Sequence, residues 1–282
     1  MTNNSELSII ILSFNTRSLL KDCLESVEKY KNEADLEVIV ADNGSGDGSP
    51  EMVKDEFPGV KIIENGENLG YARGNNRARN VAKGEYILFL NSDTVLQKGA
   101  IQKTLAYIKV RKDVGAITCK TVLPDGKPDR DARRRFPTPW ISFNRLFLGN
   151  GKPYWYGDIS PDLVHEVDVI QGAFFLTRKK ILDEVDWLDE EYFLDGEDID
   201  LCWKIRKKGY KIIYYPEVSI THVKKASKSK RGTPKFVGAG VDSMEIFYKK
   251  RLWNNYPAIL NIAVLIGIRL LKGLRYVKSL LK

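Results

Sequence analysis

The segment SIIILSF, residues 8–14, decides the fold of this chain. Five of its seven residues are apolar, and a short run of this kind is typical of a strand that is buried on both faces. EVIVA at 37–41 and YILFL at 86–90 repeat the pattern, and segments with helical periodicity lie at 19–30 and 72–82. Alternating strands and helices predict an α/β fold with a mostly parallel sheet flanked by helices.

Polar residues directly after these strands are candidate binding residues, because ligands of such sheets bind at the carboxyl ends of the strands. A short strand at 60–63 makes the segment 86–90 the fourth strand. Asn15 follows the first strand, Asp42 and Asn43 follow the second, and Asn91, Ser92 and Asp93 follow the fourth. No G-x-G-x-x-G loop follows the first strand and no G-x-x-x-x-G-K-[ST] occurs, which disfavours an ordinary dinucleotide fold or a P-loop enzyme.

The second half of the chain alternates less regularly. Residues 123–140 carry four prolines and five lysines or arginines, which predicts a long surface segment. Its run of three arginines, 133–135, is interpreted as a solvated charge cluster, with contact to an anionic acceptor phosphate as the alternative. Strands are expected at 167–177, interrupted by Gly172, and at 211–215, and residues 219–235 have loop composition.

Four carboxylates crowd into six positions of FLDGEDIDLCWKIRKKG, residues 193–209: Asp195, Glu197, Asp198 and Asp200. A helix start accounts for part of this, with Asp195 as N-cap, acids stabilised by the helix dipole, and Gly209 as terminator. Capping explains one or two acids and leaves the others in need of a functional role.

Charge is unevenly distributed along the chain. Residues 1–202 hold 26 Lys+Arg and 34 Asp+Glu, a net of −8, whereas residues 203–282 hold 19 and 3, a net of +16. A basic region of this size favours an anionic partner, either nucleic acid or a membrane surface. Nucleic acid is disfavoured because no binding motif occurs and the apolar content is high.

The C-terminal sequence favours the membrane surface. Residues 256–268 are uncharged, but these thirteen residues fall short of the ~20 that a membrane span requires. Cations then recur every third residue among leucines, at Arg269, Lys272, Arg275 and Lys278. This pattern predicts an amphipathic helix in the membrane interface with its cations toward lipid head groups, and a core-packing helix is the alternative. Three scattered cysteines and the absence of a signal-peptide pattern favour a reducing, cytoplasmic location.

Six motifs in order, over about residues 6–222, resemble the inverting family 2 glycosyltransferases of the GT-A fold. Within that family the chain is most similar to bacterial rhamnosyltransferase-like enzymes that build surface polysaccharides. The motifs are SFN, ADNGSGDGS, ENLGYARGNN, FLNSDT, QGAFFLTRKKIL and WLDEEYFLDGEDIDLCWKIRKKG. The resemblance implies a nucleotide-sugar-binding half at 1–112 and an acceptor-binding half with the catalytic base at 113–235. The charge and apolar pattern adds a basic amphipathic helical region at 236–282.

The resemblance also implies roles for individual residues. Asp198 of the E-D pair is the expected catalytic base, which the nearby acids strengthen by like-charge repulsion. A cofactor Mg²⁺ or Mn²⁺ is expected at Asp93 and His222, with Asn91 in place of the first acid of the family's D-x-D. Nucleotide-sugar contacts are expected from Phe14, Asn15, Asp42, Asn43, Arg73, Asn91, Ser92 and Asp93. Gln171, Gly172, Asp195, Glu197 and Asp200 are expected to contact the acceptor or to support the base.

The expected function is the transfer of rhamnose from dTDP-rhamnose to a lipid-linked surface glycan at the inner face of the cell membrane. The expected partners are therefore a nucleotide-diphosphate sugar, a lipid-linked or oligosaccharide acceptor, and an anionic membrane surface, without nucleic acid. A UDP-hexose donor is the alternative. A sugar nucleotidyltransferase is disfavoured because SFNTR at 13–17 is not a glycine-rich loop. A non-catalytic binding protein is disfavoured by the presence of both Asp93 and Asp198.

Overall fold

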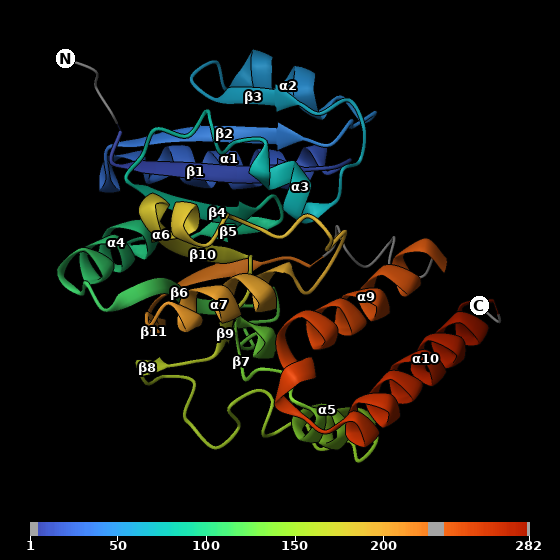
Figure 1. The fold of residues 1–282 in the computed structure, drawn as a ribbon. Helices are drawn as coiled ribbons and strands as arrows, with labels where there is room; N and C mark the ends of the chain where they lie inside the picture. The colour runs from blue at the N-terminus through green and yellow to red at the C-terminus, as the bar shows by residue number, and fades with distance from the viewer. Residues whose placement is uncertain (1–4, 225–233, 281–282) are drawn as a thin grey trace.

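The computed structural model describes residues 5–224 and 234–280, which build a twisted sheet between layers of helices (Figure 1). The strands of the central sheet are β1 Leu7–Ser13, β2 Leu36–Asp42, β3 Lys61–Glu64, β4 Tyr86–Asn91, β5 Thr94–Leu96, β6 Val114–Val122, β8 His165–Glu166, β10 Phe174–Arg178 and β11 Lys211–His222. Their order is β3-β2-β1-β4-β10-β6-β11-β5, and β8 pairs with β11 beside this path. The α/β prediction is confirmed.

The first half of the sheet is parallel and the second half is mixed. β1 pairs in parallel with β2 and β4, and β2 pairs in parallel with β3. β10 is antiparallel to both of its neighbours, β4 and β6, although β11 and β6 are parallel. β10 therefore lies between the parallel group β3-β2-β1-β4 and the group β6-β11-β5.

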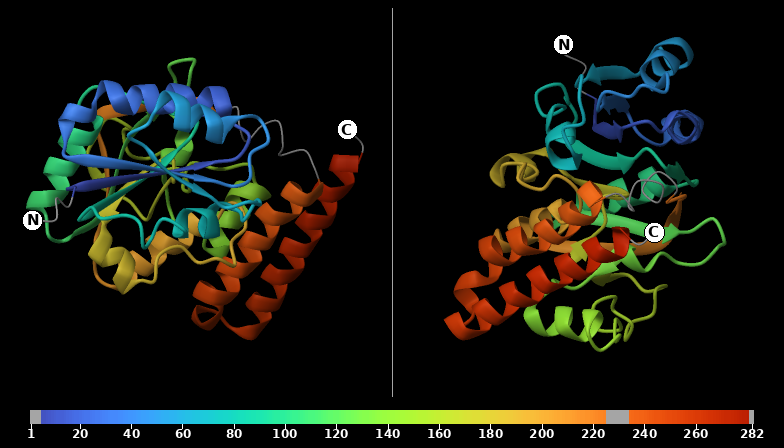
Figure 2. Two further views of the ribbon diagram at one scale, coloured as in Figure 1. Left: turned by 90° about the horizontal axis from the view of Figure 1, so that it is seen from above. Right: turned by 90° about the vertical axis from the view of Figure 1, so that its right-hand side faces the viewer.

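Helices cover both faces of the sheet, as Figure 2 shows. One face packs against α1 Arg17–Lys29, α2 Ser49–Glu56 and α4 Ala100–Val110. The other face packs against α3 Tyr71–Asn76, α6 Lys179–Glu184 and α7 Glu197–Lys207. The predicted helix at 72–82 is too long, because α3 ends within a Gly-Asn-Asn run of weak helix formers.

The helix α7 begins differently from the prediction. Its N-cap is Gly196 with φ 92°, a left-handed conformation that favours glycine, and no side chain caps the helix. Asp195 precedes the cap with φ 63° and is therefore not the N-cap. Gly209 ends the helix with φ 89°, as predicted. The expectation for Asp195 was wrong because a glycine next to it takes the capping position.

The predicted surface segment 123–140 is partly buried. Arg133 and Arg134 form the short strand β7, which pairs with β9 Val169–Ile170, and both side chains are buried. The helix α5, Pro139–Leu146, follows. The interpretation of this run as solvated charges is wrong for these two residues, because their partners come from distant parts of the chain.

A helical hairpin forms the C-terminal part of the structure. It comprises α9 Pro234–Phe247, a π-helical turn at Tyr248–Leu252, a 3-10 turn at Trp253–Asn255, and α10 Ala258–Leu280. Figures 1 and 2 show α9 and α10 side by side, beside the sheet. Among the described residues no helix is long and apolar enough to cross a membrane. Of the predicted loop 219–235, residues 219–222 belong to β11, and 225–233 lie outside the described residues.

One face of α10 packs on α9 and the opposite face is apolar and exposed. Ile268 is buried, and it joins a core cluster with Tyr192, Val241, Phe247, Tyr248 and Leu252. The exposed face carries Ile259, Ile262, Ile266, Leu270, Leu274 and Val277, which we call the α10 stripe. Arg269 and Lys272 instead lie beside α9, at 3.8 Å from Glu245 and 2.5 Å from Asp242 respectively. These two cations are paired within the hairpin, which differs from the expectation that they face lipid head groups.

Candidate active site

The loops after β1 and β2 form the first part of the candidate site. Asp42 is buried at the end of β2, and its carboxylate accepts hydrogen bonds from the backbone N–H of Ser45 at 2.7 Å and from the Ser45 hydroxyl at 2.6 Å. The Ser45 hydroxyl in turn accepts the backbone N–H of Asn15 at 2.8 Å. Asn15 is exposed with φ 52°, and half-buried Phe14 precedes it. These contacts give the two loops one fixed shape.

Asn43 connects the second loop to the segment before α3. Its amide oxygen accepts a hydrogen bond from the Asn65 side chain at 2.9 Å, and its amide nitrogen donates to the carbonyl of Gly70 at 3.0 Å. Gly70 has φ 81°, and a Cβ atom there would lie 2.4 Å from the carbonyl oxygen of Phe193. The loop after β2 and the segment before α3 therefore pack directly against the segment that leads into α7.

The D-x-D position lies at the end of β4. Asn91 is half-buried, and Ser92 is buried and accepts a hydrogen bond from the hydroxyl of Thr16 at 3.1 Å. Asp93 is 4% exposed, and its Oδ1 lies 3.1 Å from His222 Nε2. The two residues expected to bind a metal are thus adjacent, although Asp93 lies between β4 and β5 and His222 ends β11.

His222 also faces a second acid, Asp129, which the sequence did not single out. Its Nδ1 lies 3.5 Å from Oδ2 of Asp129, and Asp129 Oδ1 accepts a hydrogen bond from Lys224 Nζ at 2.8 Å. Burial opposes a charge on His222, yet its contacts with Asp129 and Asp93 leave the pKa of His222 raised above its ordinary value. Burial also opposes the charge on Asp129, but His222 and Lys224 lower the pKa of Asp129 to about 2.

The expected catalytic base pairs with a buried arginine. Asp198 lies in the first turn of α7, and its Oδ2 accepts a hydrogen bond from Arg134 at 2.5 Å. Both side chains are 11% exposed. Burial opposes the positive charge of Arg134, but Asp198 and other nearby groups leave its pKa raised well above the ordinary value.

Glu197 is buried beside this pair without a partner for its Oε2. Burial raises the pKa of Glu197 well above its ordinary value, and the negative charges of Asp198 and Asp195 raise it further. The Asp195 side chain itself is exposed. The crowding of acids in this cluster therefore contributes to the raised pKa of Glu197.

Tyr71 connects the two clusters. Burial raises its pKa, and Glu197, Asp198 and Asp93 all contribute to the rise, so these three carboxylates lie around one tyrosine. Its hydroxyl donates to the carbonyl of Gly172 at 3.2 Å, where a Cβ atom would lie 2.6 Å from the tyrosine oxygen. This close approach explains the glycine that interrupts the strand predicted at 167–177.

Buried polar atoms without partners concentrate at the site. Among the described residues, these side-chain atoms belong to Asn65, Asp93, Asp129, Arg134, Gln171, Glu197 and His222. All seven residues are in the site or adjoin it. Buried polar groups are normally paired, so unpaired ones gathered in one place indicate where a polar ligand binds.

Two expected site residues have partners elsewhere. Asp200 is fully buried, and its carboxylate accepts hydrogen bonds from Arg251 of the hairpin at 2.7 and 3.1 Å. Arg73 is exposed, and its Nε lies 3.9 Å from a carboxylate oxygen of Glu190. Asp200 thus joins α7 to the C-terminal hairpin, and Arg73 lies at the surface beside the site.

The residues fit a divalent cation in part. The described residues contain no group of three or more His, Cys, Asp or Glu side chains arranged to hold a metal. Asp93 and His222 nevertheless supply two adjacent ligands, and Asp93 Oδ2 is buried without a partner. Mg²⁺ is commonly held by one or two carboxylates together with substrate phosphates, so two protein ligands are compatible with such a site.

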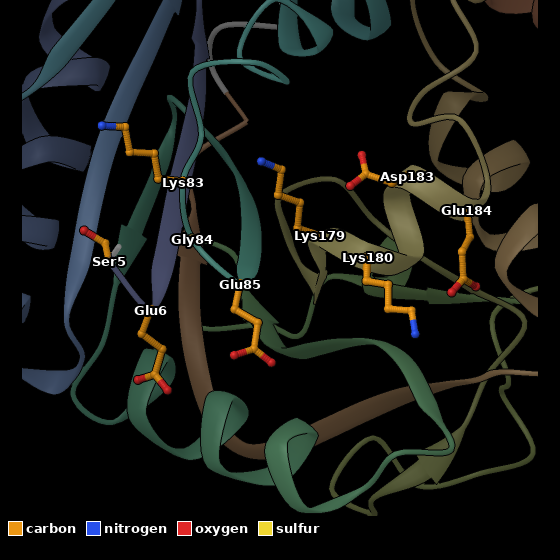
Figure 3. Close-up of a pocket in the computed structure, with 9 residues that line it drawn as sticks. All are labelled: Ser5, Glu6, Lys83, Gly84, Glu85, Lys179, Lys180, Asp183 and Glu184. Carbon is orange, nitrogen blue, oxygen red and sulfur yellow. The ribbon is translucent and has the colours of Figure 1, made fainter. Parts of the chain in front are cut away.

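A separate hollow of about 840 Å³ lies at the opposite end of the strands (Figure 3). Its lining includes Glu6 and Glu85, which directly precede β1 and β4, and it mixes three lysines with four acids. Ligands of such sheets bind at the carboxyl ends of the strands, so this hollow is not the candidate site.

Sequence reasoning missed Arg134, Asp129 and Tyr71. Arg134 belongs to a run of three arginines, and Asp129 lies among turn residues, so neither carries a local signal of burial. Tyr71 lies within the ENLGYARGNN motif, which was the available signal for it.

Comparison with known proteins shows the family of the chain. The sequence model of Glycosyl transferase family 2 matches residues 8–186. The chain is 26% identical over 266 residues to the N-acetylglucosaminyl-diphospho-decaprenol L-rhamnosyltransferase of Mycobacterium tuberculosis, covering 87% of this chain and 84% of that protein. It is 25% identical to the poly-beta-1,6-N-acetyl-D-glucosamine synthase of Staphylococcus aureus, over 74% of this chain and about half (48%) of that protein.

Solved structures share the fold. The mannosyltransferase PcManGT of Pyrobaculum calidifontis, in complex with GDP-Man and Mn²⁺, superposes with a TM-score of 0.61 at 16% identity, over 99% of this chain and 74% of that one. GalNAc-T7 with UDP, GalNAc and Mn²⁺ gives a TM-score of 0.63 at 17% identity, over 89% of this chain and 49% of that one. At these identities the likeness concerns the fold.

Proposed function

The chain belongs to glycosyl transferase family 2, and from this premise we propose that it is an inverting, metal-dependent transferase that moves rhamnose from dTDP-rhamnose to a lipid-linked glycan. The observation that carries the proposal is the gathering of unpaired buried polar atoms around Asp93, His222 and Glu197, beside Asp198. The similarity to a rhamnosyltransferase with a decaprenol-linked substrate supports the choice of donor and acceptor.

The donor is proposed to bind across the loops after β1, β2 and β4. The hydrogen bonds of Asp42 and Asn43 fix these loops, and exposed Asn15 lies at their rim. Phe14 and Ser92 follow the parallel strands β1 and β4, and together with exposed Arg73 of α3 they complete the proposed nucleotide-sugar contacts. A prearranged polar surface of this kind orients the donor without a glycine-rich phosphate loop.

Asp93 and His222 would hold the divalent cation, which when bound offsets the negative charge that develops on the departing diphosphate. Mn²⁺ in the two solved relatives supports a metal of this type. His222 projects from β11 and Asp93 follows β4, so the sheet itself sets the spacing of these two side chains.

Asp198 is proposed to act as general base. The acceptor hydroxyl oxygen attacks the anomeric carbon, the bond from that carbon to the diphosphate oxygen breaks, and the hydroxyl proton passes to Asp198. Attack from the face opposite the leaving group inverts the anomeric configuration. Arg134 holds the carboxylate in place through the 2.5 Å contact, and Glu197, Gln171 and Gly172 line the acceptor side.

A membrane-facing surface is proposed for the lipid-linked acceptor. The α10 stripe exposes six apolar residues in a row that is about 27 Å long, from Ile259 to Val277. On α5, Trp140 is 69% and Phe147 is 59% exposed, and Phe143 stacks between them with ring centroids 6.2 and 5.5 Å away. Figure 1 shows α5 and α10 together at the end of the molecule away from β3.

This surface differs from the electrostatic contact expected from the sequence. Because Arg269 and Lys272 pair with acids of α9, the apolar side chains would contribute most of the attachment. Buried, free Cys23, Cys119 and Cys202 are compatible with the reducing cytoplasmic side, and we place the enzyme at the inner face of the membrane.

The test is a panel of nucleotide sugars with Mg²⁺ or Mn²⁺ and a prenyl-diphosphate acceptor that carries a sugar, assayed for nucleoside diphosphate release. Acceptor-dependent release from dTDP-rhamnose is expected. Release from a UDP-hexose alone would replace the donor assignment. Pyrophosphate release from nucleoside triphosphates, or no release from any donor, would overturn the proposal.

A further inference from the structure

Asp129 lies next to His222 of the proposed metal site, although it is not part of the D-x-D motif. Its Oδ2 lies 3.5 Å from His222 Nδ1, and the opposite nitrogen of the ring, Nε2, lies 3.1 Å from Asp93. The three side chains are between 3% and 5% exposed. The imidazole is thus enclosed between two carboxylates, one on each ring nitrogen.

The position of Asp129 is fixed by its own contacts. Its backbone N–H donates to the carbonyl of Thr121 at 2.8 Å, and its Oδ1 accepts from the backbone N–H of Asp131 at 3.1 Å. Lys224 donates to the same Oδ1 and also to Asp131 at 3.1 Å. These bonds occupy Oδ1 and leave Oδ2 buried and without another partner, next to the imidazole.

We infer that Asp129 is a positioning residue that accepts the proton of His222 Nδ1 and thereby leaves Nε2 free to bind the divalent cation beside Asp93. A metal-bound histidine commonly donates its other ring N–H to a carboxylate, which fixes both the tautomer and the orientation of the ring. The inference rests on the metal site of the proposed function and adds a residue from the segment after β6, which the motifs of the sequence did not indicate.

Asp129→Asn gives a sharp test because it keeps the shape of the side chain. Oδ1 would still accept from Lys224 and Asp131, so the new amide nitrogen would face His222 Nδ1 as a donor. The ring would then have to accept at Nδ1 and carry its proton on Nε2, where it blocks metal binding. Asp131→Asn is the matched control, since Asp131 contacts the same lysine without an observed contact to His222.

The tautomer is measured directly by imidazole ¹⁵N NMR with saturating Mg²⁺ and dTDP. The chain has only two histidines, so His165→Asn assigns the signals without touching the site. Wild-type protein is expected to show a protonated Nδ1 and an unprotonated Nε2 for His222. The opposite tautomer in wild-type protein would overturn the inference, even if the variants failed to fold.

Metal affinity is the second readout. Mn²⁺ binding with dTDP present, followed by electron paramagnetic resonance, should weaken by 10–100-fold in Asp129→Asn and stay unchanged in Asp131→Asn. Equal affinity in wild-type protein and Asp129→Asn would overturn the role of Asp129 while leaving the metal site in place. If wild-type protein bound no Mn²⁺ with dTDP, the metal site of the proposed function would fail as well.

Discussion

Arg134 of β7 lies 2.5 Å from Asp198 in the first turn of α7, and both side chains are buried. A carboxylate held this way has a fixed direction and cannot turn away to solvent. The pair also links α7 to β7, a segment that the sequence assigned to the surface. The chemistry and the stability of this region therefore depend on the same contact.

Asp198→Asn should reduce turnover by roughly 10²–10⁴, the usual contribution of a general base, because the amide cannot take the proton of the acceptor. Donor binding should persist, since the nucleotide loops lie on other strands. Rates of nucleoside diphosphate release and calorimetric titration with dTDP measure the two effects. Near-normal turnover in the variant would show that another group takes the proton.

Arg134→Met should destabilise the protein by about 3–5 kcal/mol, because it leaves a buried carboxylate without its partner. Urea unfolding measures the loss. Arg134→Lys, which keeps the charge, should lose less. Adding Asp198→Asn to Arg134→Met should recover part of the stability, since no unpaired charge then remains, and strictly additive losses would contradict coupling of the pair.

Glu197→Gln should stabilise the protein at neutral and alkaline pH. The pKa of the Glu197 carboxyl is raised in the folded state above its unfolded value near 4.5. Its contribution to the stability of the fold is therefore fully present below pH 4.5 and is lost as the pH rises through the folded pKa. Glutamine is neutral at every pH and avoids the loss. Thermal unfolding should show that the variant is more stable than wild-type protein by a larger margin at pH 8 than at pH 5. An equal difference in stability at the two pH values would contradict a raised pKa of Glu197.

Asp93→Ala should weaken nucleotide binding only when a divalent cation is present. Asp93 supplies one of the two adjacent side chains proposed to hold the metal, and its buried Oδ2 has no other partner. Calorimetry with dTDP should therefore show similar affinities for variant and wild-type protein in EDTA and different affinities in Mg²⁺. Unchanged affinity in Mg²⁺ would remove Asp93 from the metal site.

Substituting the α10 stripe should release the protein from vesicles that contain phosphatidylglycerol. Ile262→Ser, Ile266→Ser and Leu270→Ser together remove apolar contacts from an exposed face, so the fold should persist. Lys272→Gln is the control, because Lys272 pairs with Asp242 and should contribute little to membrane binding. Equal pelleting of the triple variant and wild-type protein would show that the stripe is not an attachment surface.

Substitution is preferable to deleting residues 257–282. The structure shows that this deletion would remove Ile268 from a core cluster and Asn261 from its hydrogen bond with Tyr248 at 2.6 Å. The hairpin also contacts the segment before α7, because Ser243 donates to the carbonyl of Leu194 at 3.0 Å. A truncated protein would therefore disturb the start of α7 as well as the proposed membrane surface.

The sequence predicted those parts of the fold that depend on local pattern. The buried strands at 8–14, 37–41 and 86–90 are continuous apolar runs, and the polar residues that follow them lie at the carboxyl ends of β1, β2 and β4. The burial of Arg134 could not be predicted, because its partner Asp198 is 64 residues away in the sequence. A run of arginines carries no local feature that distinguishes buried from solvated side chains. The antiparallel direction of β10 could not be predicted from a local pattern either, since an apolar strand can pair in either direction.

The place of β10 between β4 and β6 has a consequence for synthesis of the chain. A nascent chain completes β6 at Val122 but cannot fill the gap beside β4 until Arg178 has been made, 56 residues later. At 5–20 residues per second this interval lasts about 3–11 s. During that time two apolar strands present unpaired edges, which are the sites where chains aggregate. Chaperone protection on the ribosome would therefore matter most while residues 123–178 are being translated.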